Sequence, residues 1–220
     1  MGMDDILGNL RKAVLEYDKE AVESWARKAV GQGIDPVVAF AVLTAAIKHV
    51  GDSFGKGELF LPDLVGAADA MSVASPILEE EIVRRGATRE SSGVVVIGTV
   101  YGDIHTIGKE MVATLLRANG FIVHDIGVNV TAEEFVGAIK RHQPDILAMS
   151  ALMTTTAAEQ RKTIETLKNE GLRNKVKIMV GGGAITQEFA NGIGADGYDA
   201  TAPGAAKLAT ELLGVQRRNT

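Results

Sequence analysis

A carboxylate, an imidazole and a glycine lie within one short stretch of the chain, residues 102–108 (GDIHTIG). An apolar run, residues 94–100 (VVVIGTV), precedes this stretch, and a helical pattern follows it. Ligand sites in open α/β sheets lie beyond the carboxyl ends of the strands. The change from strand to helix therefore makes residues 102–108 the first candidate for a functional site.

Asp103 lies two residues before His105, close enough for its carboxylate to accept a hydrogen bond from one imidazole nitrogen. That bond would orient the ring and make the other nitrogen a better metal donor. Gly108 would let the chain or a ligand pass closely at the start of a helix. A single axial imidazole suits a metal whose other positions are already filled, as in a macrocycle.

Two further stretches contain unusual residues after predicted strands. Ser150 and Leu152 follow one strand, with threonines at 154–156, and three glycines at 181–183 follow the next. In a doubly wound domain, the loops after strands one, three and four converge on one edge. Each stretch alone has an ordinary explanation, namely a hydrogen-bonded histidine, a serine helix cap or a glycine turn.

The elements that must position these residues fall into two parts. Residues 3–85 predict four helices with short connections, which indicates a small antiparallel four-helix bundle. Proline is favoured at a helix start, so Pro36 and Pro62 are expected to begin the third and fourth helices. Pro76 should kink or divide the fourth helix. The glycines of residues 51–62 should interrupt the helical pattern.

A polar segment at 86–92 is interpreted as a linker, and the pattern then alternates between strand and helix. Apolar strands separated by single helices predict a doubly wound, Rossmann-like or flavodoxin-like parallel sheet of five strands. The expected domains are a helical cap at 1–88 and a ligand-binding domain at 89–220. The strands are expected at 94–100, 121–126, 145–149, 176–180 and 195–199, and the helices at 107–119, 131–142, 155–170, 186–192 and 203–213.

Composition narrows the class of protein. The 220 residues carry a net charge of -5, which argues against a nucleic-acid partner. There is no cysteine, which removes disulfides and thiolate chemistry, and the four histidines contain no HExxH pair for zinc. No secretory leader and no apolar run of about 20 residues are found, so a soluble, cytoplasmic protein without a membrane partner is expected.

The three motifs together resemble the signature of cobalamin-binding domains: Asp103-x-His105-x-x-Gly108, then Ser150-x-Leu152, then Gly181-Gly182. The first gap, residues 109–149, is 41 residues long, and the second, residues 153–180, is 28 residues long. Both gaps match the family pattern. Residues 54–62 (FGKGELFLP) resemble the helical cap of methionine synthase and of small corrinoid proteins of methyltransferase systems.

The resemblance implies a role for each matching residue. His105 would be the lower axial ligand of cobalt, Asp103 would hydrogen-bond to it, and Ser150 would extend that relay. The displaced nucleotide tail would enter a channel, and apolar side chains of the cap, with Leu64 nearby, would cover the upper face. The implied cofactor-binding residues are Asp103, His105, Thr106, Gly108, Ser150, Leu152, Thr154, Gly181, Gly182, Phe54, Leu61 and Val65.

The implied function is that of a methyl carrier with a bound cobalamin or related corrinoid, in one-carbon metabolism. A substrate-specific methyltransferase would pass a methyl group to Co(I), and a second methyltransferase would take it from methyl-Co(III) to coenzyme M or tetrahydrofolate. A reductive activation protein is a further implied partner. The chain would be a subunit of such a system and not a catalyst alone.

Three alternatives stay open at this point. The small subunit of an adenosylcobalamin-dependent mutase shares the Asp-x-His-x-x-Gly pattern, although Phe54 and Leu61 would crowd an adenosyl group. A cobalamin-dependent sensor or regulator has a similar architecture, but no helix-turn-helix segment is evident. A flavodoxin-like domain without a corrinoid would leave the three matching motifs to coincidence.

Overall fold

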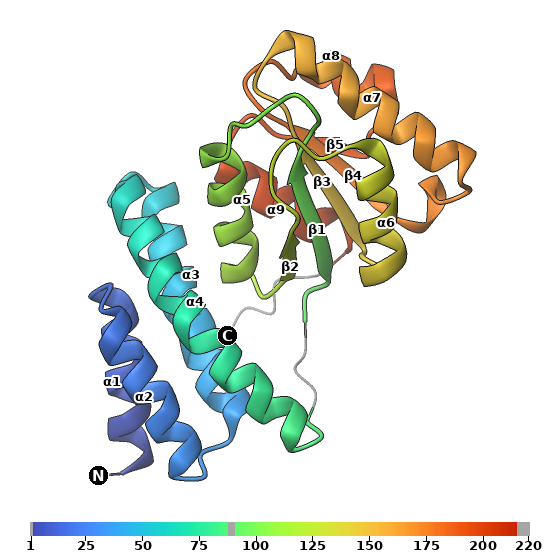
Figure 1. Ribbon diagram of the computed structural model, residues 1–220. Coiled ribbons are helices and arrows are strands. Elements are labelled where there is room, and N and C mark those ends of the chain that lie inside the picture. Colours follow the sequence, from blue (N-terminus) through green and yellow to red (C-terminus); the bar gives the residue numbers. More distant parts are fainter. Residues whose placement is uncertain (1, 88–90, 215–220) are drawn as a thin grey trace. The chain divides into compact units, whose positions relative to one another are not determined.

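The computed structural model describes residues 2–87 and 91–214. The chain divides into two compact units, residues 1–90 and 91–220, a helical unit and an α/β unit (Figure 1). The expected domain boundary between residues 88 and 89 lies outside the described residues.

The helical unit contains α1 (Met3–Leu15), α2 (Lys19–Gly31), α3 (Pro36–Gly55) and α4 (Leu61–Arg84). Aspartates begin two of these helices: the side chain of Asp18 accepts from the Ala21 amide, and that of Asp35 accepts from the Val37 amide. Pro36 occupies the first turn of α3, as predicted. The buried stripes of the four helices form the core, which includes Leu10, Val14, Val22, Leu43, Ile47, Leu64 and Leu78.

The structure corrects two expectations about where the helices of this unit end or break. The helix α3 continues through Gly51 to Gly55, so Phe54 lies in its last turn and not in a loop. Pro76 does not divide α4, which is one helix of 24 residues. Proline removes one helical hydrogen bond, but buried residues on both sides of it, such as Met71 and Leu78, keep the helix packed on its neighbours.

The helix α3 meets the length and composition expected of a membrane span, contrary to the prediction that no run approaches this size. Core helices meet the same criterion, and nine residues of α3 are buried within the helical unit. It is the one such helix in the described part of the chain.

The α/β unit has a parallel sheet in the order β2-β1-β3-β4-β5, which is the flavodoxin-like order. Helices α5 and α9 lie on one face, and α6, α7 and α8 lie on the other (Figure 1). This confirms the predicted helical part followed by a doubly wound sheet. The bounds are β1 (Val94–Thr99), α5 (Ile107–Ala118), β2 (Ile122–Asp125), α6 (Ala132–His142), β3 (Ile146–Ser150), α7 (Thr154–Asn169), a 3₁₀ turn (Arg173–Lys175), β4 (Lys177–Gly181), α8 (Gln187–Ile193), β5 (Gly197–Tyr198) and α9 (Ala202–Leu212).

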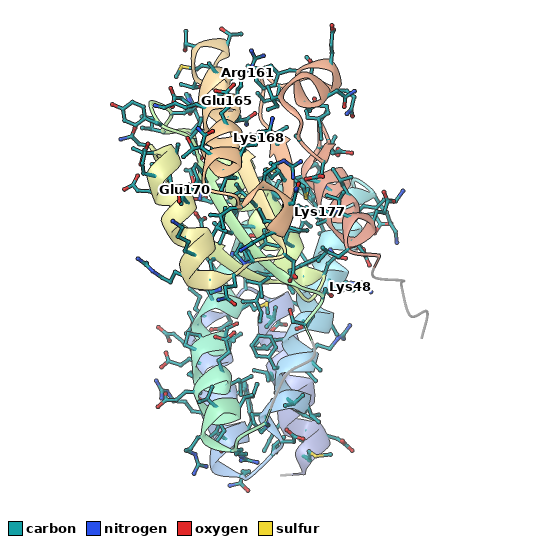
Figure 2. The ribbon with its side chains drawn as sticks, turned by 90° about the vertical axis from the view of Figure 1, so that its right-hand side faces the viewer. Lys48, Arg161, Glu165, Lys168, Glu170 and Lys177 are labelled. Carbon is teal, nitrogen blue, oxygen red and sulfur yellow. The ribbon has the colours of Figure 1, made fainter. Side chains whose placement is uncertain are left out.

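Helix α7 shows how the sheet is covered. Its inner face buries Ile164 and Leu167 in the core that also contains Leu147 of β3. Its outer face carries charged side chains, among them Arg161, Glu165 and Lys168 (Figure 2). The inner face is not wholly apolar, since Thr156, Gln160 and Thr163 are also buried there. Buried polar side chains need hydrogen-bond partners, and the partner of Thr156 is Asp103 of the candidate site.

Candidate functional site

The loops that follow β1, β3 and β4 lie side by side at the carboxyl edge of the sheet. The strand register pairs Thr99 with Ser150, and Ser150 with Gly181, so the last residues of the three strands are neighbours. The three motifs found in the sequence therefore meet at one edge, as the doubly wound topology requires.

Asp103 is the centre of this edge and is fully buried. Its Oδ1 accepts from the His105 amide at 3.0 Å and from His105 Nδ1 at 2.7 Å. Its Oδ2 accepts from the Leu152 amide at 2.8 Å and from Thr156 Oγ1 at 2.7 Å. Burial alone would raise the pKa of Asp103, but these hydrogen bonds favour the charged form and hold the pKa well below its usual range.

His105 presents one ring nitrogen to a ligand. An ionised carboxylate can only accept, so Nδ1 carries a proton, and in the neutral imidazole Nε2 then has the lone pair. The side chain is 48% exposed, and no hydrogen bond to Nε2 is found among the described residues. The same part of the chain contains no group of three or more His, Cys, Asp or Glu side chains placed to hold a metal ion. The site therefore offers a single, oriented imidazole donor.

Exposed apolar side chains are concentrated in the loops at this edge of the sheet. Of the eleven large exposed hydrophobic residues in the described ranges 2–87 and 91–214, six belong to the loops after β1, β2 and β3 or to the first residue of α5: Tyr101, Ile104, Ile107, Val128, Leu152 and Met153. Ile104, directly before His105, is 73% exposed. Such a concentration of exposed apolar surface marks a binding site. Here it suits a ligand with a large apolar face.

The glycines at this edge of the sheet differ in how much space a side chain would have. A Cβ on Gly182 would lie 2.0 Å from the Ala151 carbonyl oxygen, and the φ of Gly182 is +119°, so the backbone needs glycine there. A Cβ on Gly183 would lie 2.8 Å from Leu152 Cδ1. A Cβ on Gly108, by contrast, would meet nothing within 4 Å. Packing therefore explains Gly182 but leaves Gly108 without a structural reason.

The predicted link from Asp103 to Ser150 is not present in this structure. Oδ2 of Asp103 accepts from the Thr156 hydroxyl, and no side-chain hydrogen bond of Ser150 is found in the described part of the chain. The reason is geometric, because Thr156 is one turn into α7 and faces the sheet. Thr156 was not among the predicted site residues, although its place in the threonine run at 154–156 was a signal.

The other predicted residues occupy different places. Thr106 precedes α5 and donates to Glu110 Oε1 at 2.6 Å, and Thr154 is exposed at the start of α7. In the helical unit, Phe54 and Leu61 are half-buried and Val65 is 46% exposed.

Two neighbours of these residues differ in exposure. Leu64, expected near the upper face of the ligand, is fully buried in the core. Phe60, directly before α4, is 72% exposed.

Comparisons with protein families match both units. Residues 93–207 match the family described as "B12 binding domain", and residues 6–79 match a second family with the same description. The first match spans the whole sheet and all three motifs.

Similar proteins cover nearly the whole chain. A trimethylamine corrinoid protein of Methanosarcina barkeri is 41% identical over 96% of this chain and 98% of its own length. A dimethylamine corrinoid protein of Methanosarcina acetivorans is 44% identical over 97% and 100%. A chain in the methanol:cobalamin methyltransferase complex MtaBC from Methanosarcina barkeri has a TM-score of 0.86 at 32% identity, over 97% of this chain and 81% of that one.

Proposed function

The chain belongs to the B12-binding family of corrinoid proteins, and from this premise we propose that it is a methyl carrier of a corrinoid-dependent methyltransferase system. The bound corrinoid would supply a cobalt centre that accepts and releases a methyl group. The residues of this chain would bind that cofactor, orient its lower ligand and shield it. The oriented imidazole of His105 on an apolar platform is the observation that carries the proposal.

The residues present fit a corrinoid. A corrin ring fills four positions around its metal, so one protein donor suffices, and His105 Nε2 is such a donor. The exposed apolar side chains around His105 match the broad apolar underside of a macrocycle. The open space above Gly108 leaves room for a ligand at the start of α5.

Asp103 would set the donor strength of His105. It is buried and charged, and it holds the proton at Nδ1 of the imidazole, so Nε2 stays available. A carboxylate behind a metal-bound imidazole fixes its tautomer and orientation and raises its basicity. Thr156 and the Leu152 amide would in turn hold Asp103, which links the loop after β3 to the ligand on the loop after β1.

The nucleotide tail of the corrinoid would lie along the edge of the sheet. We propose that the channel uses Gly108 and Thr106 at the start of α5, together with the loops after β3 and β4. Gly182 allows those two loops to approach each other closely. The residues proposed for the tail are Thr106, Gly108, Ser150, Leu152, Thr154, Gly181 and Gly182.

Phe54, Leu61 and Val65 would contact the upper face of the corrinoid. They lie in the last turn of α3 and the first two turns of α4, and none of them is fully buried in the helical unit. Apolar side chains there would keep water and oxygen from the reduced metal. They would have to move when a partner enzyme approaches.

Two methyltransferases are the proposed partners. One would deliver the methyl group from a substrate, and the other would transfer it to coenzyme M or a tetrahydrofolate. A reductive activation protein would restore the reduced metal after accidental oxidation. The named relatives support this assignment, since they are corrinoid proteins for methylamines, and a similar chain occurs in a methyltransferase complex.

Reconstitution with hydroxocobalamin tests the proposal. The wild-type chain should bind it and show the visible spectrum of a histidine-ligated corrinoid, whereas His105→Ala should lose that spectrum and bind about tenfold more weakly or worse. His142→Ala, at the end of α6, is the matched control and should behave as the wild type. A wild-type chain that ignores corrinoids would contradict the proposal.

Methyl transfer then separates a carrier from a sensor. The chain loaded with methylcobalamin should lose its methyl group to coenzyme M or tetrahydrofolate in the presence of a purified methyltransferase. A chain that binds the cofactor but never gives up its methyl group to either acceptor would favour the sensor.

A further inference from the structure

The segment that carries His105 is short and is held by hydrogen bonds within it and to neighbouring segments. Residues 100–106 connect β1 to α5, and within this loop the Asp103 amide donates to the Val100 carbonyl at 3.1 Å. Thr99 Oγ1 donates to the His105 carbonyl at 3.0 Å, which holds the far end of the loop. The amide of Gly102, which lies within the turn from Val100 to Asp103, has its partner outside the loop.

Asn129, in the loop after β2, supplies that partner. Its side-chain Oδ1 accepts from the Gly102 amide at 2.8 Å, and its own amide donates to the Asp103 carbonyl at 2.9 Å. One residue thus holds both the Gly102 N–H and the Asp103 carbonyl, two backbone groups close to the Asp103–His105 pair. Asn129 has no hydrogen bond to the imidazole or to the Asp103 carboxylate.

The backbone of Asn129 is suited to this double contact. Its φ is +56°, in the left-handed region, where asparagine is among the few side chains that are tolerated. This conformation directs the amide and the side-chain oxygen of one residue toward the same neighbouring loop. Glycine would tolerate the backbone but lacks the side-chain oxygen.

Asn129 is itself held in place. The Thr99 amide donates to the Gly127 carbonyl, and the Val130 amide donates to the Thr99 carbonyl, both at 3.0 Å. Asp125, at the end of β2, accepts from the Gly127 amide and from the buried ammonium of Lys109 in α5. The loop after β2 is therefore fixed at both ends and forms a firm support.

We propose that Asn129 is a positioning residue for the Asp103–His105 pair, which holds the imidazole where a corrinoid can use it. The inference rests on the proposed role of His105 as the ligand. The Asp103–His105 hydrogen bond of 2.7 Å leaves little room for the loop to shift. Without Asn129 Oδ1, the Gly102 amide would lose its partner, and the turn that leads into Asp103 and His105 would be held less firmly.

Three substitutions in the full chain separate the side chain from the backbone. Asn129→Ala and Asn129→Gly both remove the acceptor, but only alanine strains the left-handed backbone. Asn129→Asp keeps an acceptor oxygen and tolerates this backbone. Gln143→Ala is the matched control, since Gln143 also has a positive φ, of 45°, but caps α6 away from the site.

The first measurement needs no cofactor. The imidazole ¹⁵N shifts of His105 in the ligand-free chain report the tautomer with its proton on Nδ1. That population should fall in Asn129→Ala and Asn129→Gly, and remain at the wild-type level in Asn129→Asp and Gln143→Ala.

The second measurement is titration with hydroxocobalamin. Affinity and the histidine-ligated spectrum should drop about tenfold or more in the alanine and glycine variants and recover in Asn129→Asp. Wild-type behaviour of Asn129→Ala, or rescue by Asn129→Gly, would overturn the proposal. If the wild type binds no corrinoid, the proposed function fails, and the tautomer measurement still decides the role of Asn129.

Discussion

At the scale of single residues, the site depends on one buried carboxylate. Asp103 lies under His105, receives donors from two other segments and is fully removed from water. An isolated buried charge is costly, and it persists only where several hydrogen bonds satisfy it. The loops after β1 and β3 are therefore tied together by the same group that orients the imidazole.

The outer partner of Asp103 can be tested by comparing two hydroxyl residues. Thr156→Val keeps the shape but removes the buried donor, so it should lower the free energy of unfolding by about 1.5–3 kcal/mol, the contribution of a hydrogen bond to a charged group. Ser150→Ala should change the stability of the ligand-free chain by less than about 0.5 kcal/mol. Urea unfolding followed by circular dichroism measures both, and Thr156→Ser should restore most of the loss. Equal losses in Thr156→Val and Ser150→Ala would show that Ser150 shares the role.

These two hydroxyl residues show how far sequence reasoning reaches at the residue scale. The pairing of Asp103 with His105 could be predicted because it is local, two residues apart. The contact from Thr156 to Asp103 spans 53 residues and depends on how α7 is turned on the sheet. The motif spacing identified the segment but not which hydroxyl within it points inward.

At the scale of elements, the carboxyl edge depends on close approach between neighbouring strand ends. Gln160 of α7 donates through Nε2 to the Met149 carbonyl at 3.0 Å and to the Gly181 carbonyl at 3.1 Å. It bridges the ends of β3 and β4 from the inner face of α7. The backbone of Gly182 also lies so close to that of Ala151 that a Cβ at position 182 would overlap it.

Two glycines of this edge should therefore differ in role: Gly182 should be needed for stability, and Gly108 for corrinoid binding. Gly182→Ala should destabilise the ligand-free chain by at least about 2 kcal/mol, because the new Cβ would overlap the backbone of Ala151.

Gly108→Ala should leave stability unchanged or raise it by up to about 1 kcal/mol, since the position is helical and open. Its Cβ would instead occupy space proposed for the corrinoid and should weaken binding about tenfold. Thermal unfolding and hydroxocobalamin titration measure the two effects. A Gly108→Ala chain with wild-type affinity would remove Gly108 from the proposed channel.

The elements themselves were largely predictable, and the exceptions have physical reasons. Alternating apolar strands and amphipathic helices identified the sheet and the four helices from periodicity alone. The end of α3 was misplaced because glycine has low helix propensity, yet Gly51 is buried against its neighbours and stays helical. Pro76 was given too much weight for a similar reason, because packing on both sides of it holds α4 together.

At the scale of the whole molecule, each unit exposes apolar side chains where the family resemblance places the cofactor. The helical unit exposes Phe60 and Val65 around the half-buried Leu61, and the α/β unit exposes Ile104 and Leu152 beside His105. A contiguous patch of exposed apolar side chains commonly marks a binding site. Under the proposed function, these exposed side chains would contact the corrinoid.

A substitution in the helical unit tests whether Phe54 shields the corrinoid. Phe54→Ala in the full chain should leave the histidine-ligated spectrum intact, because His105 and Asp103 belong to the other unit. If Phe54 shields the upper face, the reduced, corrinoid-loaded variant should be oxidised by dissolved oxygen several-fold faster than the wild type. Val83→Ala is the matched control, since Val83 is 78% exposed at the far end of α4 from Leu61, and it should oxidise at the wild-type rate. Stopped-flow absorbance measures the oxidation, and circular dichroism checks that both variants are folded. An unchanged rate in Phe54→Ala would assign this side chain to packing of the helical unit alone.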